Sequence, residues 1–175
     1  SRSAGYQTQT TIQTTVMSRL RYLVIYLSLV VALVLMILPL PDWVQIYRPN
    51  WVALVLIYWS MALPKRVGLW FAFFTGIILD ASQGTLLGQH TLALVVVIFI
   101  NMNFYQRIRV LALAQQAIYV FVLLLINQLI VAWIEGVMGR PTPLLAFFGA
   151  PFVGMLIWPW VFVVLRDIRR KAILK

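Results

Sequence analysis

The fold is decided by residues 65–109, which read KRVGLWFAFFTGIILDASQGTLLGQHTLALVVVIFINMNFYQRIR. Basic residues stand at both ends of this stretch, and the 40 residues from 67 to 106 are mostly apolar. One membrane crossing takes about 20 residues, so the stretch is long enough to cross a bilayer and return. Its midpoint falls between Gly84 and Gly88, where two glycines favour a turn. We therefore predict two short membrane helices, at about residues 67–83 and 89–105.

The composition extends this interpretation to the whole chain. The 175 residues are 63% hydrophobic, with a mean hydropathy of +0.95, whereas soluble domains are roughly 45–50% apolar. The net charge of +10 does not indicate a nucleic-acid partner, because the charges punctuate apolar runs instead of forming a polar surface. The absence of cysteine excludes disulfides, thiolate metal ligands and cysteine nucleophiles.

Basic clusters mark the cytoplasmic side of a membrane. Four clusters occur in the sequence, at residues 19–21, 65–66, 107–109 and 166–175. The three gaps between them each suit an outward hairpin, so we predict an all-α integral membrane protein with six transmembrane helices in three outward hairpins. Every basic residue except Arg48 and Arg140 then lies on the cytoplasmic side, together with both termini. This orientation places the protein in a cytoplasmic membrane as a multi-pass protein.

The prediction divides the chain into three parts. Residues 1–18 are expected to be a flexible polar N-terminal tail, residues 19–170 the six-helix membrane domain, and residues 171–175 a basic cytoplasmic tail. The run Trp51–Leu63 is short for a crossing, and Pro151 and Pro159 interrupt the last span. Trp158 and Trp160 are expected to anchor that span at the inner interface.

Asp80 is the only acid embedded in an apolar stretch. An ionised carboxylate costs about 2.5–3.5 kcal/mol at the bilayer centre on insertion scales, and less near an interface, so Asp80 needs a partner. One interpretation is a binding or proton-relay carboxylate. The other is a helix-end acid that hydrogen-bonds the glycine turn or an arginine. Our hypothesis is that Arg48 or the Asn50 amide, on the same side by topology, pairs with it, and the alternative is that Arg48 extends to the lipid headgroups.

The remaining polar groups favour packing over chemistry. Asn127 and Gln128 lie deep in the fifth span, where amides usually form interhelical hydrogen bonds, with substrate contact as the alternative. The lone His90 has no second ligand cluster and is expected to pack or to meet water. Glycines recur at intervals of 4 or 8 residues, which favours close helix packing, at Gly68, Gly76, Gly84 and Gly88. The sequence therefore predicts no catalytic, cofactor-binding or metal site, and no cofactor.

Several motifs together resemble one known family. They are Leu38-Pro39-Leu40-Pro41-Asp42, Arg48-Pro49-Asn50-Trp51, Tyr58-Trp59, Ala62-Leu63-Pro64-Lys65-Arg66-Val67-Gly68, Gly76-x-x-Leu79-Asp80-x-x-x-Gly84-x-x-Leu87-Gly88 and Leu156-Ile157-Trp158-Pro159-Trp160. In this order they resemble the rod shape-determining MreD family, particularly its gammaproteobacterial members, from about residue 22 to residue 170. Each piece alone is common, and the combination is specific.

The resemblance implies a non-enzymatic scaffold of the bacterial inner membrane, in the rod complex that inserts peptidoglycan along the side wall. The implied partners are MreC, MreB, RodA, a class B penicillin-binding transpeptidase and RodZ, with membrane lipid around them. The family is also similar to the S components of energy-coupling-factor vitamin transporters, which share a six-helix membrane fold. A small-molecule-binding or transport subunit, with Asp80, Asn127 and Gln128 lining a cavity, is therefore the alternative.

Overall fold

The computed structural model describes residues 2–174, and this part of the chain is entirely helical outside its loops. The elements are α1 (Arg2–Ile37), α2 (Asp42–Gln45), α3 (Trp51–Ala62), α4 (Leu69–Gln83), α5 (Gln89–Ile108), α6 (Leu113–Val137) and α7 (Leu144–Leu174). Four segments are long and apolar enough to cross a membrane: Gly5–Ile37, Gln89–Ile108, Leu113–Val137 and Leu144–Ala172. Helices α3 and α4 are apolar but shorter. The protein is therefore a multi-pass membrane protein.

Helix α3 is the centre of the bundle. Every residue from Val52 to Met61 is buried, so all faces of this helix are covered by protein. It packs against α1, α5 and α7, and Trp59 Nε1 donates a hydrogen bond of 2.9 Å to Ser28 Oγ on α1. Twelve residues make a helix only about 18 Å long. A helix of this length can lie inside a membrane bundle when other helices, not lipid, surround it.

Helices α4 and α5 form the hairpin predicted from residues 65–109. Helix α4 ends at Gln83 and α5 begins at Gln89. The turn between them uses left-handed backbone at Gly84 (φ 65°) and Gly88 (φ 105°), a conformation that glycine adopts without steric cost. Helices α6 and α7 also pack against each other, and α6 lies against α5.

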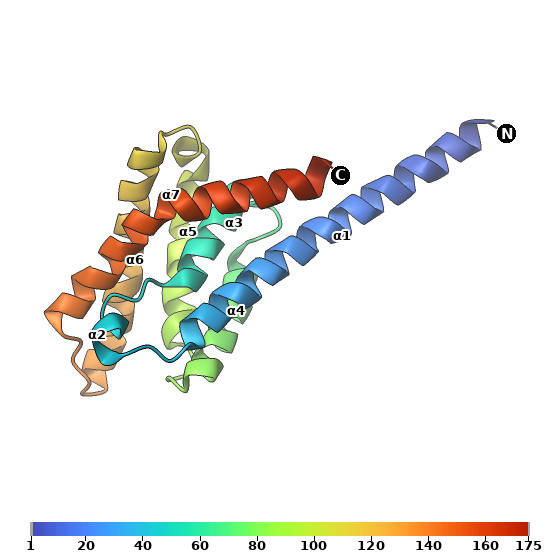
Figure 1. Cartoon of the computed structure of the whole chain (residues 1–175). Coiled ribbons are helices and arrows are strands. Elements are labelled where there is room, and N and C mark those ends of the chain that lie inside the picture. Colours follow the sequence, from blue (N-terminus) through green and yellow to red (C-terminus); the bar gives the residue numbers. More distant parts are fainter. Residues whose placement is uncertain (1, 175) are drawn as a thin grey trace.

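The N-terminal segment differs from its prediction as a flexible tail. Helix α1 continues without a break from Arg2 to Ile37, and Figure 1 shows its N-terminal part projecting beyond the bundle. The residues from Gly5 to Met17 are exposed. Threonine hydroxyls donate to backbone carbonyls one turn earlier, for example Thr11 to Gln7 (2.8 Å) and Thr15 to Thr11 (2.8 Å). The boundary between a tail of residues 1–18 and a membrane domain of residues 19–170 remains a prediction.

Helix α7 contains both prolines and remains helical on either side of them. Figure 1 shows α7 changing direction along its length, as expected where proline removes a backbone hydrogen bond. Trp158 is fully buried, whereas Trp160 is 75% exposed. The prediction of a paired aromatic anchor is therefore wrong for Trp158, because residues two apart on a helix point to nearly opposite sides, so only one of the two rings can face outward.

Candidate functional site

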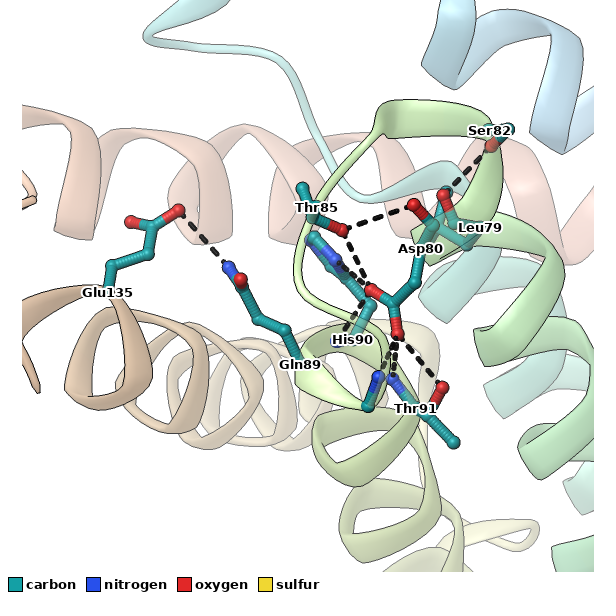
Figure 2. A network of polar contacts seen from close by, with 9 residues as sticks. Leu79, Asp80, Ser82, Thr85, Gln89, His90, Thr91 and Glu135 are labelled. Carbon is teal, nitrogen blue, oxygen red and sulfur yellow. Dashed lines mark hydrogen bonds and ion pairs between the residues drawn. The ribbon is translucent and has the colours of Figure 1, made fainter. Parts of the chain in front are cut away.

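Asp80 lies on the last turn of α4, and none of its surface is exposed. Its carboxylate sits at the N-terminus of α5, with Gly88 at the N-cap of that helix (Figure 2). Helix N-termini carry unpaired N–H groups and the positive end of the helix dipole, so a carboxylate there is stabilised. Asp80 thus acts as the cap that Gly88, which has no side chain, does not supply.

Each carboxylate oxygen of Asp80 accepts three hydrogen bonds, six in all. Oδ1 accepts from Thr85 Oγ1 (3.0 Å), His90 N (3.0 Å) and His90 Nδ1 (2.8 Å). Oδ2 accepts from Gly88 N (3.0 Å), Thr91 N (3.2 Å) and Thr91 Oγ1 (2.9 Å). Figure 2 shows these donors surrounding the carboxylate. We call Asp80, Thr85, Gly88, His90 and Thr91 the Asp80 cluster.

The backbone around this cluster has no unpaired donor from residue 88 to residue 92. The N–H groups of Gly88, His90 and Thr91 bond to Asp80. The N–H of Gln89 bonds to Leu86 O, and that of Leu92 bonds to Gly88 O. The start of α5 is therefore fully satisfied inside the hairpin.

The prediction that Arg48 or Asn50 pairs with Asp80 is wrong. Arg48 donates to the carbonyls of Met36 and Leu38 and so caps the end of α1. Asn50 accepts from Ala53 N at 3.1 Å and caps the start of α3. The interpretation of Asp80 as an acid that bonds the glycine turn is confirmed, but the donors come from the turn and from α5 instead of an arginine.

Gly76 lets α4 and α5 approach each other one turn before Asp80. A Cβ at this position would lie 2.5 Å from Thr91 Cα and 3.0 Å from Thr91 N. Residues four apart share a helix face, so Gly76 and Asp80 both point toward the start of α5. Close packing is thus confirmed at Gly76. At Gly84 and Gly88 the glycines serve the turn, and at Gly68 the nearest atom to an added Cβ is 3.9 Å away.

A second set of contacts ties α5 to the far end of α6. Gln89 Nε2 donates to Glu135 Oε1 at 3.2 Å, a contact also visible in Figure 2. Glu135 Oε2 accepts from Thr142 Oγ1 at 2.8 Å, in the loop before α7. These bonds hold the loops at one end of the bundle together.

His90 also faces a polar cavity of about 100 Å³. Its polar lining consists of Arg48, Asn50, His90, Asn127 and Gln128. Asn127 Oδ1 and Arg48 Nε are buried there without a hydrogen-bond partner among the described residues. The structure therefore brings together five polar side chains that the sequence analysis had considered separately, but Asp80 does not line this cavity.

The predicted interhelical bonding of Asn127 is not what the structure shows. Asn127 is 3% exposed, and its side-chain oxygen Oδ1 accepts no hydrogen bond from any described residue. One buried amide that does link helices is Asn101, which the sequence analysis missed. Asn101 Nδ2 donates to Ser60 Oγ (2.5 Å) and Ile57 O (3.2 Å), and Tyr119 Oη donates to Asn101 Oδ1 (3.2 Å). The signal available was an asparagine within the apolar run of the hairpin.

The arrangement around Asp80 suits structure better than catalysis. A carboxylate that already accepts six hydrogen bonds has no free lone pair directed at a substrate. Within residues 2–174, no group of three or more His, Asp or Glu side chains is placed to hold a metal ion. The cluster therefore fixes the geometry of the α4–α5 hairpin.

The fold and this site define a class: multi-pass helical membrane proteins whose buried polar groups hold helices together. The family model of the rod shape-determining protein MreD matches residues 17–168. The rod shape-determining protein MreD of Haemophilus influenzae is 35% identical over 159 residues, which cover 87% of this chain and 94% of that protein. No solved structure matches the chain. The chain belongs to the MreD family, and the resemblance seen in its motifs is confirmed.

Proposed function

We propose that the protein is a non-enzymatic scaffold of the rod complex, which supports rod shape and lateral peptidoglycan synthesis. Family membership across residues 17–168 is the observation that carries this proposal. The relative in Haemophilus influenzae is named a rod shape-determining protein. The saturated hydrogen bonding of Asp80 agrees with a structural role, since its carboxylate is committed to the hairpin.

The proposed topology has six spans in three outward hairpins, with both termini in the cytoplasm of a bacterium and the bundle in its inner membrane. The hairpin α4–α5 and the packed pair α6–α7 support this arrangement. The basic clusters support the orientation, because cytoplasmic loops collect lysine and arginine. Helices α3 and α4 would complete the six spans as short helices within the bundle.

Because the chain has no cysteine, the topology is testable without removing any native thiol. Single cysteines at Leu86 and Val110 lie in the turns at opposite ends of α5. In intact cells, a membrane-impermeant maleimide is expected to label Leu86→Cys and to leave Val110→Cys unlabelled until the membrane is opened. The reverse pattern would contradict the orientation.

The proposed partners are MreC as a direct contact, with MreB, RodA, the class B penicillin-binding transpeptidase and RodZ in the same complex. An apolar groove of about 500 Å³ between α1 and α7, floored by α3, offers a packing surface within the membrane. Its lining includes Val31 on α1, Val55 on α3 and Val164 on α7. Transmembrane helices associate by such van der Waals packing.

The deciding experiment is depletion in a rod-shaped bacterium, followed by complementation with photo-crosslinkers in the chain. Depletion is expected to round the cells, and a crosslinker at Val31 or Val164 to trap a component of the cell-wall machinery. A crosslinker at Trp70, exposed on α4 outside the groove, is the matched control. Normal shape on depletion would overturn the scaffold proposal.

A small-molecule-binding subunit of S-component type is the second candidate, and the polar cavity favours it. Arg48, Asn127 and Gln128 there would suit a small anionic or amide-bonding ligand. The size argues against a vitamin, because pockets for molecules of that kind are about 300–1,000 Å³, whereas this cavity is about 100 Å³. Loss of vitamin uptake with normal shape would favour this candidate over the scaffold.

A further inference from the structure

A different cavity lies at the other end of α5 from the Asp80 cluster. It has a volume of about 200 Å³ and is lined by Tyr58, Met61, Ala62, Arg109, Gln116, Phe162 and Arg169. These residues come from the end of α3, the loop after α5, the first turns of α6 and the second half of α7. We call it the basic cavity. Arg109 and Arg169 belong to two of the basic clusters that flank the apolar spans, and such clusters are expected near lipid headgroups.

Two guanidinium groups without carboxylate partners face this space. Arg109 and Arg169 line the cavity, and neither forms an ion pair within the described residues. The nearest acid along α7, Asp167, is exposed and is absent from the lining. Arg169 lies with its guanidinium carbon 6.0 Å from the centre of the Tyr58 ring, which holds it over the cavity. The lining itself therefore holds two cationic groups and no acidic one, although Asp167 acts on Tyr58 from outside it.

Two buried polar atoms in the same lining also lack partners. Tyr58 and Gln116 are each 2% exposed. The Tyr58 hydroxyl and Gln116 Oε1 have no hydrogen-bond partner among the described residues. The amide nitrogen of Gln116 is used, since it donates to Ile108 O (3.1 Å) and Leu111 O (3.3 Å), so the orientation of the amide is fixed. One donor and one acceptor thus remain for a molecule that enters the cavity.

We propose that the basic cavity binds the phosphate-ester headgroup of an anionic phospholipid. Arg109 and Arg169 pair with the phosphate, since guanidinium forks match phosphate oxygens. The Tyr58 hydroxyl donates to a phosphate oxygen, and Gln116 Oε1 accepts from a hydroxyl of the headgroup. The volume equals roughly six water molecules at about 30 Å³ each, enough for a phosphate with a short hydroxylated chain. This site is independent of the scaffold role proposed above.

The test uses the purified full chain in detergent, with phosphatidylglycerol as the probe, since its headgroup carries a phosphate diester and hydroxyls. Binding is measured by native mass spectrometry and by the shift in thermal unfolding. Arg169→Gln is compared with Arg170→Gln, which removes the same charge from an exposed neighbouring position. Losing the charged hydrogen bonds is expected to weaken binding about tenfold in the first variant. The second variant is expected to change it less than about twofold.

Tyr58→Phe is expected to have opposite effects on stability without lipid and on lipid binding. Without lipid, the melting temperature is expected to stay the same or rise, because a buried hydroxyl without a partner is removed. With phosphatidylglycerol, the variant is expected to bind about three- to fivefold more weakly than the wild type. A lower melting temperature without lipid, or unchanged lipid binding, would overturn the assignment of Tyr58 as a ligand contact.

Two further probes distinguish a lipid headgroup from soluble inorganic phosphate as the ligand. Diacylglycerol with the same acyl chains has no phosphate and is expected not to bind in an Arg169-dependent way. If millimolar inorganic phosphate displaces phosphatidylglycerol from the wild type, the cavity recognises the phosphate alone, from a soluble source. If it does not, the lipid is the ligand. Equal loss in Arg169→Gln and Arg170→Gln would overturn the site in favour of general surface attraction.

Discussion

Replacing Asp80 by asparagine tests the role of the Asp80 cluster. The best orientation of the new amide keeps its oxygen toward Gly88 N and Thr91 N, the Oδ2 side of the native carboxylate. Its NH₂ group then faces the Oδ1 donors. The Thr85 hydroxyl and the His90 ring can switch to accepting, but the backbone N–H of His90 cannot, so one buried donor loses its acceptor.

The expected cost is the sum of two effects. An unsatisfied buried N–H costs about 1–3 kcal/mol, and the two retained backbone bonds each lose about 1 kcal/mol when the acceptor becomes neutral. We therefore expect Asp80→Asn to lower the free energy of unfolding by about 3–5 kcal/mol.

Reversible unfolding of the purified chain in mixed micelles, followed by near-UV circular dichroism, measures this loss. Asp42→Asn is the control, because Asp42 is exposed and forms no ion pair within the described residues. A loss below about 1 kcal/mol, or one equal to that of Asp42→Asn, would refute the structural role of the carboxylate.

Four other substitutions are measured by the same unfolding assay. Gly76→Ala places a Cβ 2.5 Å from Thr91 Cα, so we expect a loss of about 1–3 kcal/mol from forced separation of α4 and α5. Gly136→Ala, inside α6 with no atom within 4 Å of the added Cβ, is the matched control and is expected to stabilise by up to about 1 kcal/mol. Gly84→Ala puts a side chain at φ 65° and is expected to cost about 1–2 kcal/mol. Asn127→Leu removes an amide whose oxygen has no described partner, so stability is expected to change by less than about 1 kcal/mol. A large loss there would show that a ligand or water holds the amide.

The hairpin of α4 and α5 was predictable because its signals are local. Basic residues at 65–66 and 107–109 bound the stretch, and Gly84 and Gly88 stand where the turn must fall. The structure places helix ends at Gln83 and Gln89, as the spacing predicted. Charge and backbone freedom depend on the residue type alone, so both can be read from the sequence without knowing the fold.

The partners of Asp80 were not predictable in the same way. The sequence analysis searched for a cation or an amide, whereas three of the six donors are backbone N–H groups of Gly88, His90 and Thr91. Every residue type except proline has a backbone N–H, so the residue types do not indicate which N–H groups will bond to Asp80. His90 was noted as a lone histidine, but its contact with Asp80 depends on the tight turn that Gly84 and Gly88 permit.

The burial of Trp158 and the orphaned oxygen of Asn127 depend on tertiary packing as well. Both residues lie within long apolar runs, where their sequence context is the same as that of lipid-facing neighbours. The face that α7 turns to the bundle is set by its packing against α6, α1 and α3, and the face of α6 by α5 and α7. Helical period alone does not decide between these faces when the helix is apolar all round.

The Asp80 cluster also bears on how the protein is made. Every donor to the carboxylate lies within eleven residues after Asp80. The charge is therefore compensated by hydrogen bonds from the turn and the first turn of α5 alone, with no contribution from α6 or α7. We expect this hairpin to be able to enter the bilayer during biogenesis as a self-sufficient unit, because the acid of α4 needs no later helix to satisfy it.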